Sequence, residues 1–412
     1  NKIRGDNDIS YDIESIRLKQ AFEQKGFLVN SIVITQFAYQ DKAVRFEKYL
    51  DNLSIKHSRT YNINGYPNDI NHILSPDGFG KNDYVKTQRP LVVITGPGPG
   101  SGKMATCLSQ MYLDHEMGQT SSYAKFETFP IWNLALMHPV NMAYEAATAN
   151  LNDVNMIDPY HLESYGQSAV NYNRDVEAFP VLKKMLEKIM GEAPYKSPTD
   201  MGVNMVGFCI IDEEAAIEAS KEEIIRRYYN SLVDYRFAKE SYTSIEKIQT
   251  LMSNLDIEAE DRRVAIGARK KQEYTGKESF AIELEDGQII TGKKSNLFSA
   301  PAAAILNTLK KLGKIDDEIL LLSPHIIEPV SNLKTKSLGE VEPSLSINEM
   351  LIALAISATT NPLTHMAMQE IKNLKNLDAH STVILNDSEK SELRKLGLNF
   401  TQDAVFGDDS EY

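Results

Sequence analysis

The chain has 412 residues, of which 42% are hydrophobic and 25% are charged. This length is enough for two or three domains, and the composition is typical of a folded protein with a sizeable core. The net charge of −13 at pH 7 argues against a nucleic-acid backbone or an anionic membrane as the main partner.

Cysteine usage and apolar runs predict where the protein resides. The two cysteines, Cys107 and Cys209, are expected to be small buried hydrophobic residues of a helix and a strand, not partners in a disulfide or a metal site. The longest purely apolar run, Met350–Ile356, is far shorter than the roughly 20 residues that cross a bilayer. With no signal-peptide pattern at the start, we expect a cytoplasmic protein.

In the first half of the chain, segments with strand patterns alternate with segments with helix patterns. The expected helices are about Ile9–Lys25, Asp41–Leu50, the segment after Lys103, Val176–Met190 and the segment opened by Asp212. The expected strands are Leu28–Thr35, a short one near Thr60, Leu91–Thr95, Tyr123–Phe126, Asn155–Ile157 and Val206–Ile211. The alternation predicts an α/β domain: a mostly parallel sheet with helices on both faces, similar to P-loop and Rossmann folds.

Two further stretches of this half carry expectations. An α/β unit normally leads with a strand, whereas this chain opens on Asn1 and a helix, so we expect a further N-terminal segment before Asn1. The turn-rich stretch Asn62–Asp83 is typical equally of a functional lid and of a surface excursion.

The second half predicts a smaller α/β domain. Residues 241–276 read as a charged helical connector, and Asp286-Gly287 is placed to turn a β-hairpin. The other expected elements are helices at Pro301–Leu312, Ile347–Ala358 and Leu363–Leu374, and strands at Glu318–Leu322 and Thr382–Leu385. The predicted organisation is therefore an α/β domain at 1–240, a connector at 241–276 and a second α/β domain at 277–412.

The segment Leu91–Thr106, LVVITGPGPGSGKMAT, combines a strand pattern, a glycine-rich turn and the start of a helix. Glycines let backbone N–H groups approach an anion, and a helix N-terminus adds about half a positive charge. The sequence therefore predicts a phosphate site. Its expected ligand-binding residues are Gly96, Gly98, Gly100, Ser101, Gly102, Lys103, Thr106 and, from a later segment, Arg174.

The same loop departs from the Walker A pattern at two positions. Pro97 stands where the first glycine belongs, and Met104 replaces the hydroxyl residue that holds Mg²⁺, with Thr106 two positions further on. The spacing of Met104 with later apolar residues predicts that it faces the core. The pattern thus favours phosphate binding over ATP hydrolysis, and the alternative is a tight turn without a ligand.

Four residues are candidates for catalysis. Asp212 ends an apolar run as in a Walker B motif, although an N-cap role for it is favoured. Glu127 and Asp158 follow predicted strands, at the sheet edge where α/β proteins bind ligands. His161 is near Asp158 in sequence and is a candidate base. Ordinary surface acids and a hydrogen-bonding histidine remain open as alternatives, as does a surface ion pair for Arg174.

Zinc chemistry is not expected. His115-Glu116 begins like the metalloprotease pattern H-E-x-x-H, but the fifth position is Gln119. The cofactor is otherwise unknown, and Mg²⁺ remains compatible with the loop.

Several long motifs resemble one family of uncharacterised bacterial proteins of unknown function. The motifs include ITGPGPGSGKMATCLSQMY, DVNMIDPYHLE, YKSPTDMGVNM and LDAHSTVIL, and the resemblance covers nearly the whole chain. Some relatives carry automated labels as ATP-dependent zinc proteases, which the incomplete His115 motif does not support. The resemblance implies a conserved bacterial protein and provides no catalytic residues.

The sequence therefore leaves three classes of function open. The first is an enzyme that binds a nucleotide or a phosphorylated small molecule at 96–103, for phosphoryl transfer. The others are a non-catalytic anion-binding regulatory protein and an interaction scaffold whose glycine turn is structural. Homo-oligomerisation is left open.

Overall fold

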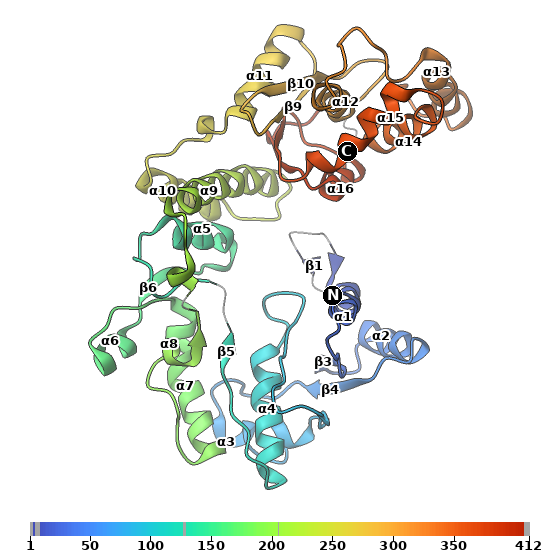
Figure 1. The fold of residues 1–412 in the computed structure, drawn as a ribbon. Coiled ribbons are helices and arrows are strands. Elements are labelled where there is room, and N and C mark those ends of the chain that lie inside the picture. Colours follow the sequence, from blue (N-terminus) through green and yellow to red (C-terminus); the bar gives the residue numbers. More distant parts are fainter. Residues whose placement is uncertain (1–2, 5–8, 127–128, 205, 408–412) are drawn as a thin grey trace. The chain divides into compact units, whose positions relative to one another are not determined.

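The computed structural model describes residues 3–4, 9–126, 129–204 and 206–407 (Figure 1). The chain divides into two units. Unit 1 comprises Asn1–Ala135 and Asn155–Cys209, and unit 2 comprises Leu136–Val154 and Ile210–Tyr412. The predicted connector at 241–276 lies within unit 2.

Unit 1 is built from short strands and mostly short helices. Its helices are α1 (Tyr11–Gln24), α2 (Asp41–Asn52), α3 (Ile70–Ile73), α4 (Lys103–Glu116), α6 (Pro159–Tyr165), α7 (Asn173–Met190) and α8 (Pro198–Met201), with 3₁₀ turns η1 (Phe79–Lys81) and η3 (Val206–Cys209). Its strands are β1 (Ile3–Arg4), β2 (Ile9–Ser10), β3 (Ile32–Phe37), β4 (His57–Tyr61), β5 (Lys125–Phe126), β6 (Asn155–Ile157), β7 (Val170–Tyr172) and β8 (Gly202–Val203). The expected helices of this half are confirmed.

The strands of unit 1 pair two by two. β3 and β4 are parallel, with Ile32 opposite His57, and β5 and β8 are also parallel. β6 with β7 and β1 with β2 are antiparallel. The described residues thus form an α/β unit with parallel pairs, but they contain no large parallel sheet of the Rossmann type.

The predicted strand Leu91–Thr95 is wrong. The segment pairs with no strand of the described part of the chain, and Leu91 and Val93 are 81% and 76% exposed. An apolar run forms a strand only where a neighbouring strand takes its backbone hydrogen bonds and a second layer covers its side chains. The sequence pattern shows that the side chains are apolar enough to be covered, but it does not show whether a neighbouring strand is present.

The core of unit 1 lies mainly between α4 and α7. Leu108 and Met111 of α4 pack with Phe179 and Leu186 of α7, and all four are buried. Met104 contacts the same core, which confirms its predicted orientation. This packing fixes the direction of α4 and therefore of the glycine loop that leads into it.

Unit 2 is rich in helices around one sheet. Its helices are α5 (Pro139–Ala147), α9 (Glu213–Arg236), α10 (Tyr242–Asn254), α11 (Arg263–Thr275), α12 (Ala300–Leu312), α13 (Pro324–Asn332), α14 (Ile347–Ser357), α15 (Pro362–Gln369) and α16 (Asp387–Leu396). Shorter turns are η2 (Ala149–Leu151), η4 (Ala259–Asp261), the π-helical η5 (Leu333–Ser337) and η6 (Glu370–Leu374). Its strands are β9 (Ser279–Glu283), β10 (Ile289–Lys293), β11 (Asp378–Ser381) and β12 (Asn399–Gln402).

The sheet of unit 2 has the order β10-β9-β11-β12. β9 and β10 form the predicted hairpin, and Gly287 supplies the positive φ of 77° at its turn. β11 runs antiparallel to β9 and parallel to β12. Helices α11 and α12 pack against β9 and β10 (Figure 1), so the charged segment at 241–276 supplies a helix to this sheet.

Three further expectations are wrong. Val206–Ile211 is not a buried strand: it contains η3, its Ile211 is fully exposed, and Cys209 is exposed as well. Glu318–Leu322 forms turns. The strand expected at Thr382–Leu385 lies earlier, at β11. The first two segments have strand-like compositions but form a 3₁₀ turn or irregular turns. In the third, the strand ends just before the apolar run begins.

Candidate functional site

The glycine loop is held from behind by α1 and β3. The Tyr11 hydroxyl donates to the carbonyl of Pro99 (3.0 Å), and Thr35 Oγ1 donates to the carbonyl of Ser101 (3.1 Å). Gly102 has φ +84°, and a Cβ there would lie 2.9 Å from the Thr35 side chain. Only glycine therefore fits between β3 and the first turn of α4.

Lys103 is the first residue of α4, and its exposed side chain turns back over the loop. Its Nζ donates to the carbonyl of Gly98 (3.1 Å) and lies 3.4 Å from Ser101 Oγ. Partial loss of hydration lowers the pKa of Lys103, and the charge of Lys125 lowers it further. Lys103 forms no ion pair with a described residue, so this ammonium lies over the loop without a counter-charge.

Lys125, on β5, is a neighbouring cation that the sequence analysis missed. Its Nζ lies 2.6 Å from the Tyr172 hydroxyl, 4.8 Å from the centre of that ring, and pairs with Asp175. The guanidinium of Arg174, in the first turn of α7, lies 5.5 Å from the same ring. The Tyr172 ring thus connects Arg174 with Lys125, whose charge in turn acts on Lys103.

The remaining predicted loop residues stabilise the conformation of the turn. Thr106 is buried, and its hydroxyl donates to the carbonyl of Gly102 (3.0 Å). A Cβ on Gly96 would lie 2.5 Å from Ser101 Oγ, and Gly100 has φ +68°. Cys107, one residue further along α4, is half-buried, and its burial raises its pKa to about 11, so it is not a reactive thiolate at neutral pH.

Asp158 and His161 belong to a separate buried cluster of unit 1. Asp158 is fully buried and accepts hydrogen bonds from the N–H groups of Tyr160, His161 and Thr199 and from the Thr199 hydroxyl. These bonds cap α6 and tie it to α8. Four donors occupy both carboxylate oxygens, which is the geometry of a structural cap.

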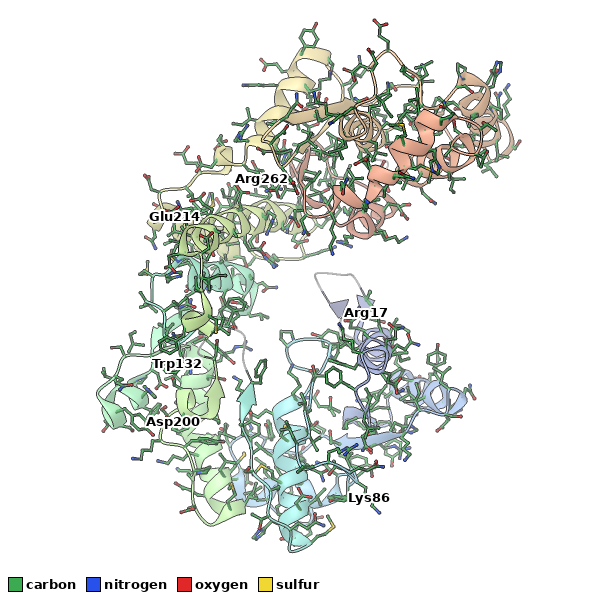
Figure 2. The ribbon with its side chains drawn as sticks, in the orientation of Figure 1. Arg17, Lys86, Trp132, Asp200, Glu214 and Arg262 are labelled. Carbon is green, nitrogen blue, oxygen red and sulfur yellow. The ribbon has the colours of Figure 1, made fainter. Side chains whose placement is uncertain are left out.

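His161 is equally enclosed. Its Nδ1 lies 2.9 Å from Ser197 Oγ and 3.7 Å from Asp200 Oδ1, while the Trp132 ring lies 5.9 Å away (Trp132 and Asp200 are labelled in Figure 2). Both polar partners meet the same ring nitrogen. A serine–histidine–acid relay needs them on opposite nitrogens, so this arrangement orients α6 and α8 and does not form that relay.

Asp212 caps α9, and Glu127 lies outside the described residues. The Asp212 carboxylate accepts from the N–H of Ala215 (3.0 Å), beside the exposed Glu214 in the first turn (labelled in Figure 2). Among the described residues, the segment directly before Asp212 (206–211) contains η3 and no strand, so it does not supply the strand that a Walker B motif requires. Asp212 belongs to unit 2, whereas the glycine loop belongs to unit 1.

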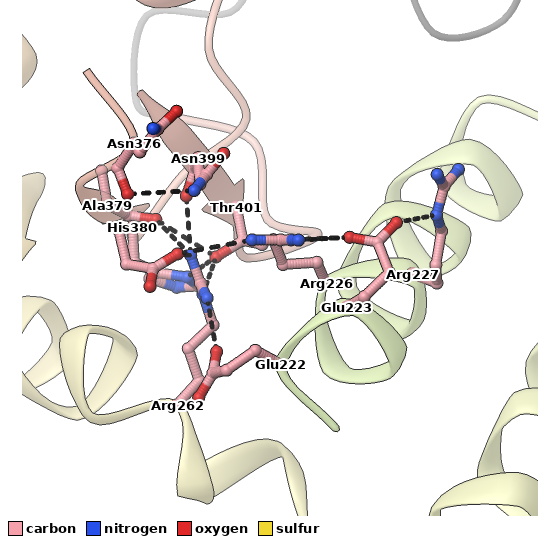
Figure 3. Close-up of polar contacts among 11 residues, drawn as sticks. Glu222, Glu223, Arg226, Arg227, Arg262, Asn376, Ala379, His380, Asn399 and Thr401 are labelled. Carbon is pink, nitrogen blue, oxygen red and sulfur yellow. Dashed lines mark hydrogen bonds and ion pairs between the residues drawn. The ribbon is translucent and has the colours of Figure 1, made fainter. Parts of the chain in front are cut away.

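A buried ionic network of unit 2 was also missed (Figure 3). Arg262 is 1% exposed. Its guanidinium donates to Glu222 of α9 (2.9 Å), Asp378 of β11 (3.0 Å) and Thr401 of β12 (2.9 Å), and to the carbonyls of Ala379 and Asn399. One side chain thus joins a helix to two strands. A single arginine in a charged segment gives no sequence signal of such burial.

His380 and Asp403 continue this network. His380 Nδ1 lies 2.8 Å from Thr401 Oγ1, and its Nε2 lies 3.3 Å from Asp403. Burial lowers the pKa of His380. Although burial opposes it, hydrogen bonds from His380 and Arg269 hold the pKa of Asp403 at about 2. The histidine is therefore neutral and the acid is charged at neutral pH.

Comparison with known proteins places the chain in a family. "Domain of unknown function DUF1846, N-terminal" matches residues 1–256, and "Domain of unknown function DUF1846, C-terminal" matches residues 260–412. The chain belongs to the DUF1846 family. The predicted resemblance to a conserved bacterial family of unknown function is thereby confirmed.

Curated relatives in this family are called UPF0371 proteins. Those of Streptococcus pneumoniae strains CGSP14 and JJA are each 56% identical over 411 residues, which is 100% of this chain and 83% of each relative. That of strain Hungary19A-6 is 55% identical over the same span. The name UPF0371 states no activity, so the site of this DUF1846 protein is argued from its geometry.

The described residues contain no group of three or more histidine, cysteine, aspartate or glutamate side chains arranged to bind a metal ion. Among the same residues, every helix is too short or too polar to cross a bilayer.

Proposed function

We propose that the glycine loop and the start of α4 bind the phosphate group of a nucleotide or another phosphorylated small molecule. The observation that carries the proposal is the position and the unbalanced charge of the Lys103 ammonium. Its ammonium lies over a glycine-rich turn at the N-terminus of a 14-residue helix, has a lowered pKa and has no carboxylate partner among the described residues. A bound phosphate would supply the missing counter-charge.

Lys125 and Arg174 would extend this site. Lys125 is close enough to affect the pKa of Lys103, and Arg174 shares the Tyr172 ring with it. An anion between these cations would relieve the repulsion between the two lysines. This arrangement suits a ligand with more than one anionic group, such as a nucleoside di- or triphosphate.

Binding without phosphoryl transfer is the form of this function that we favour. Asp158 and Asp212 both act as helix caps, and Met104 stands where a hydroxyl would hold Mg²⁺. Phosphoryl transfer is the alternative, and it would need a base that the described residues do not present at the loop. A nucleotide that binds and is recovered unchanged after long incubation would support the non-catalytic form.

The first prediction concerns Lys103→Ala. ATP, ADP and pyrophosphate, with and without Mg²⁺, are tested by thermal unfolding and calorimetry. At about 100-fold above its Kd, a ligand should raise the melting temperature of the unsubstituted protein by roughly 5 °C. Lys103→Ala should abolish this shift, because it removes the cation that touches the loop.

The matched control is Lys48→Ala, an exposed lysine of α2 in the same unit. It should leave the shift unchanged. If none of the three ligands stabilises the protein, or if both variants lose binding equally, the loop is not the phosphate site.

A further inference from the structure

Unit 1 contains a cavity of about 460 Å³ that no predicted site residue lines. Three segments form it: the residues before β3, the end of α2 with the residues before β4, and residues 84–88. Its volume lies in the range of about 300–1,000 Å³ that small-molecule sites occupy. The cavity is therefore large enough for a metabolite.

Specific hydrogen bonds hold its walls. Asn30 Nδ2 donates to the carbonyl of Lys86 (2.9 Å), which joins the residues before β3 to the segment 84–88. The Gln110 side chain of α4 binds both the N–H and the carbonyl of Val85, each at 3.2 Å. A chain segment without regular structure is thus fixed on both sides, and the cavity is a built feature of the fold.

The lining is polar and carries an excess of positive charge. Lys56 and Lys86 are exposed, and neither forms an ion pair with a described residue. The lining carboxylate is Asp51, which lies 3.9 Å from His57 Nδ1. In a protein with a net charge of −13, two lysines without acid partners favour an anionic ligand. Lysine rather than arginine is typical of a phosphate contact made by point charges.

Hydroxyl and amide groups accompany these charges. Ser31, Ser54 and Ser58 line the cavity together with Asn30 and Gln88. Such groups donate to and accept from the hydroxyls of a polyol. The lining thus combines cations for a phosphate with hydrogen-bonding groups for a sugar.

This cavity is distinct from the glycine loop. Asn30 and Ser31 precede the first residue of β3, whereas Thr35, further along the same strand, binds the loop at Ser101. A strand advances about 3.3 Å per residue, so the two sites lie toward opposite ends of β3.

We propose that this cavity binds a phosphorylated sugar, with Lys56 and Lys86 contacting the phosphate and the serine hydroxyls contacting the sugar. The site is separate from the loop at 96–103, and it does not depend on the function proposed for that loop.

The test uses ribose 5-phosphate as the probe and ribose as its neutral counterpart, titrated calorimetrically into the full chain. Ribose 5-phosphate should bind and ribose should not. The double variant Lys56→Ala/Lys86→Ala should weaken binding at least about tenfold, since contacts to charged groups are the stronger ones. Lys48→Ala, which replaces an exposed lysine of α2 outside the cavity lining, should leave this binding unchanged.

Folding is checked by circular dichroism and thermal unfolding, and Lys56→Gln/Lys86→Gln serves as a second variant that keeps the side-chain length. Because both lysines are exposed, both double variants should retain the parent melting temperature. The proposal is overturned if ribose 5-phosphate does not bind at millimolar concentration. It is also overturned if binding survives both double variants, or if Lys103→Ala removes binding while they do not.

Discussion

At the scale of single residues, the sequence suggested catalytic roles for side chains whose hydrogen bonds hold helices in place. Asp158 and His161 look like an acid and a base in IDPYHLE, yet each is enclosed by partners that fix short helices. Conversely, no motif marks Lys125 or Arg262. The charge of Lys125 lowers the pKa of Lys103, and Arg262 joins α9 to the sheet of unit 2. The burial of a side chain and its hydrogen-bond or ion-pair partners distinguish a structural role from a functional one, and a sequence motif shows neither.

The second prediction concerns acid stability and His380. Its folded pKa is lowered below the ordinary value of 6.5, so its contribution to stability is complete above pH 6.5 and is lost as the pH falls through the folded pKa. For Asp403, with a folded pKa of about 2 against 3.8, the loss occurs between those values. Between pH 7.5 and 5.5, protonation of His380 in the unfolded state should therefore lower the free energy of unfolding.

Urea unfolding at pH 7.5 and pH 5.5 measures this difference. His380→Gln should be less stable than the parent at pH 7.5, and it should lose less stability on acidification. His365→Gln, an exposed histidine of α15, is the control and should follow the parent. Identical losses in the parent and in His380→Gln would contradict the prediction.

At the scale of elements, helices were predicted much better than strands. The periodic patterns of α4, α7 and α9 specify helices from local information, because each helix satisfies its own backbone hydrogen bonds. Leu91–Thr95 and Val206–Ile211 have strand-like compositions, but a strand also needs a neighbour, and the sequence pattern does not contain that information. The glycines and the lysine of the loop could be identified from their spacing in the sequence. The cavity beside β3 and β4 could not, because three segments that are separate in the sequence form it.

The third prediction compares two helix caps. Asp158 is buried and accepts four hydrogen bonds, whereas Asp212 is exposed and accepts one that the structure records. Asp158→Ala should therefore cost about 3 kcal/mol of unfolding free energy, and Asp212→Ala about 1 kcal/mol. Chemical denaturation measures both.

A third variant, Asp158→Asn, tests the structural role of Asp158. If it is a cap and not a reacting group, Asp158→Asn should lose stability, while a nucleotide should still bind at the glycine loop. Equal costs for the two alanine variants would show that burial does not set the importance of these caps.

At the scale of the whole molecule, neither unit is a continuous piece of chain. The chain leaves unit 1 after Ala135, contributes α5 to unit 2 and returns at Asn155. Met142 and Ala146 of α5 are buried against Ile224 and Ile225 of α9. A boundary placed at one point of the sequence therefore cannot separate the two cores.

The fourth prediction concerns the fragment 1–209. It contains α5 but not α9, so the apolar face of α5 should be exposed. The fragment should bind the dye ANS and aggregate, and replacing residues 136–154 by a short glycine-serine linker should reduce both. Dye fluorescence and light scattering measure the effect, and equal behaviour of the two fragments would refute it.

The insertion of α5 also imposes an order of events during synthesis. Roughly 65 residues separate the end of α5 from the start of α9, and a ribosome adding roughly 5–20 residues per second needs about 3–13 s to make them. Throughout that interval the nascent α5 lacks α9, the helix against which it packs, while the second part of unit 1 is still being synthesised. The protein cannot finish one unit before it begins the other, so its vectorial folding includes an obligatory wait during which a chaperone has a defined apolar target.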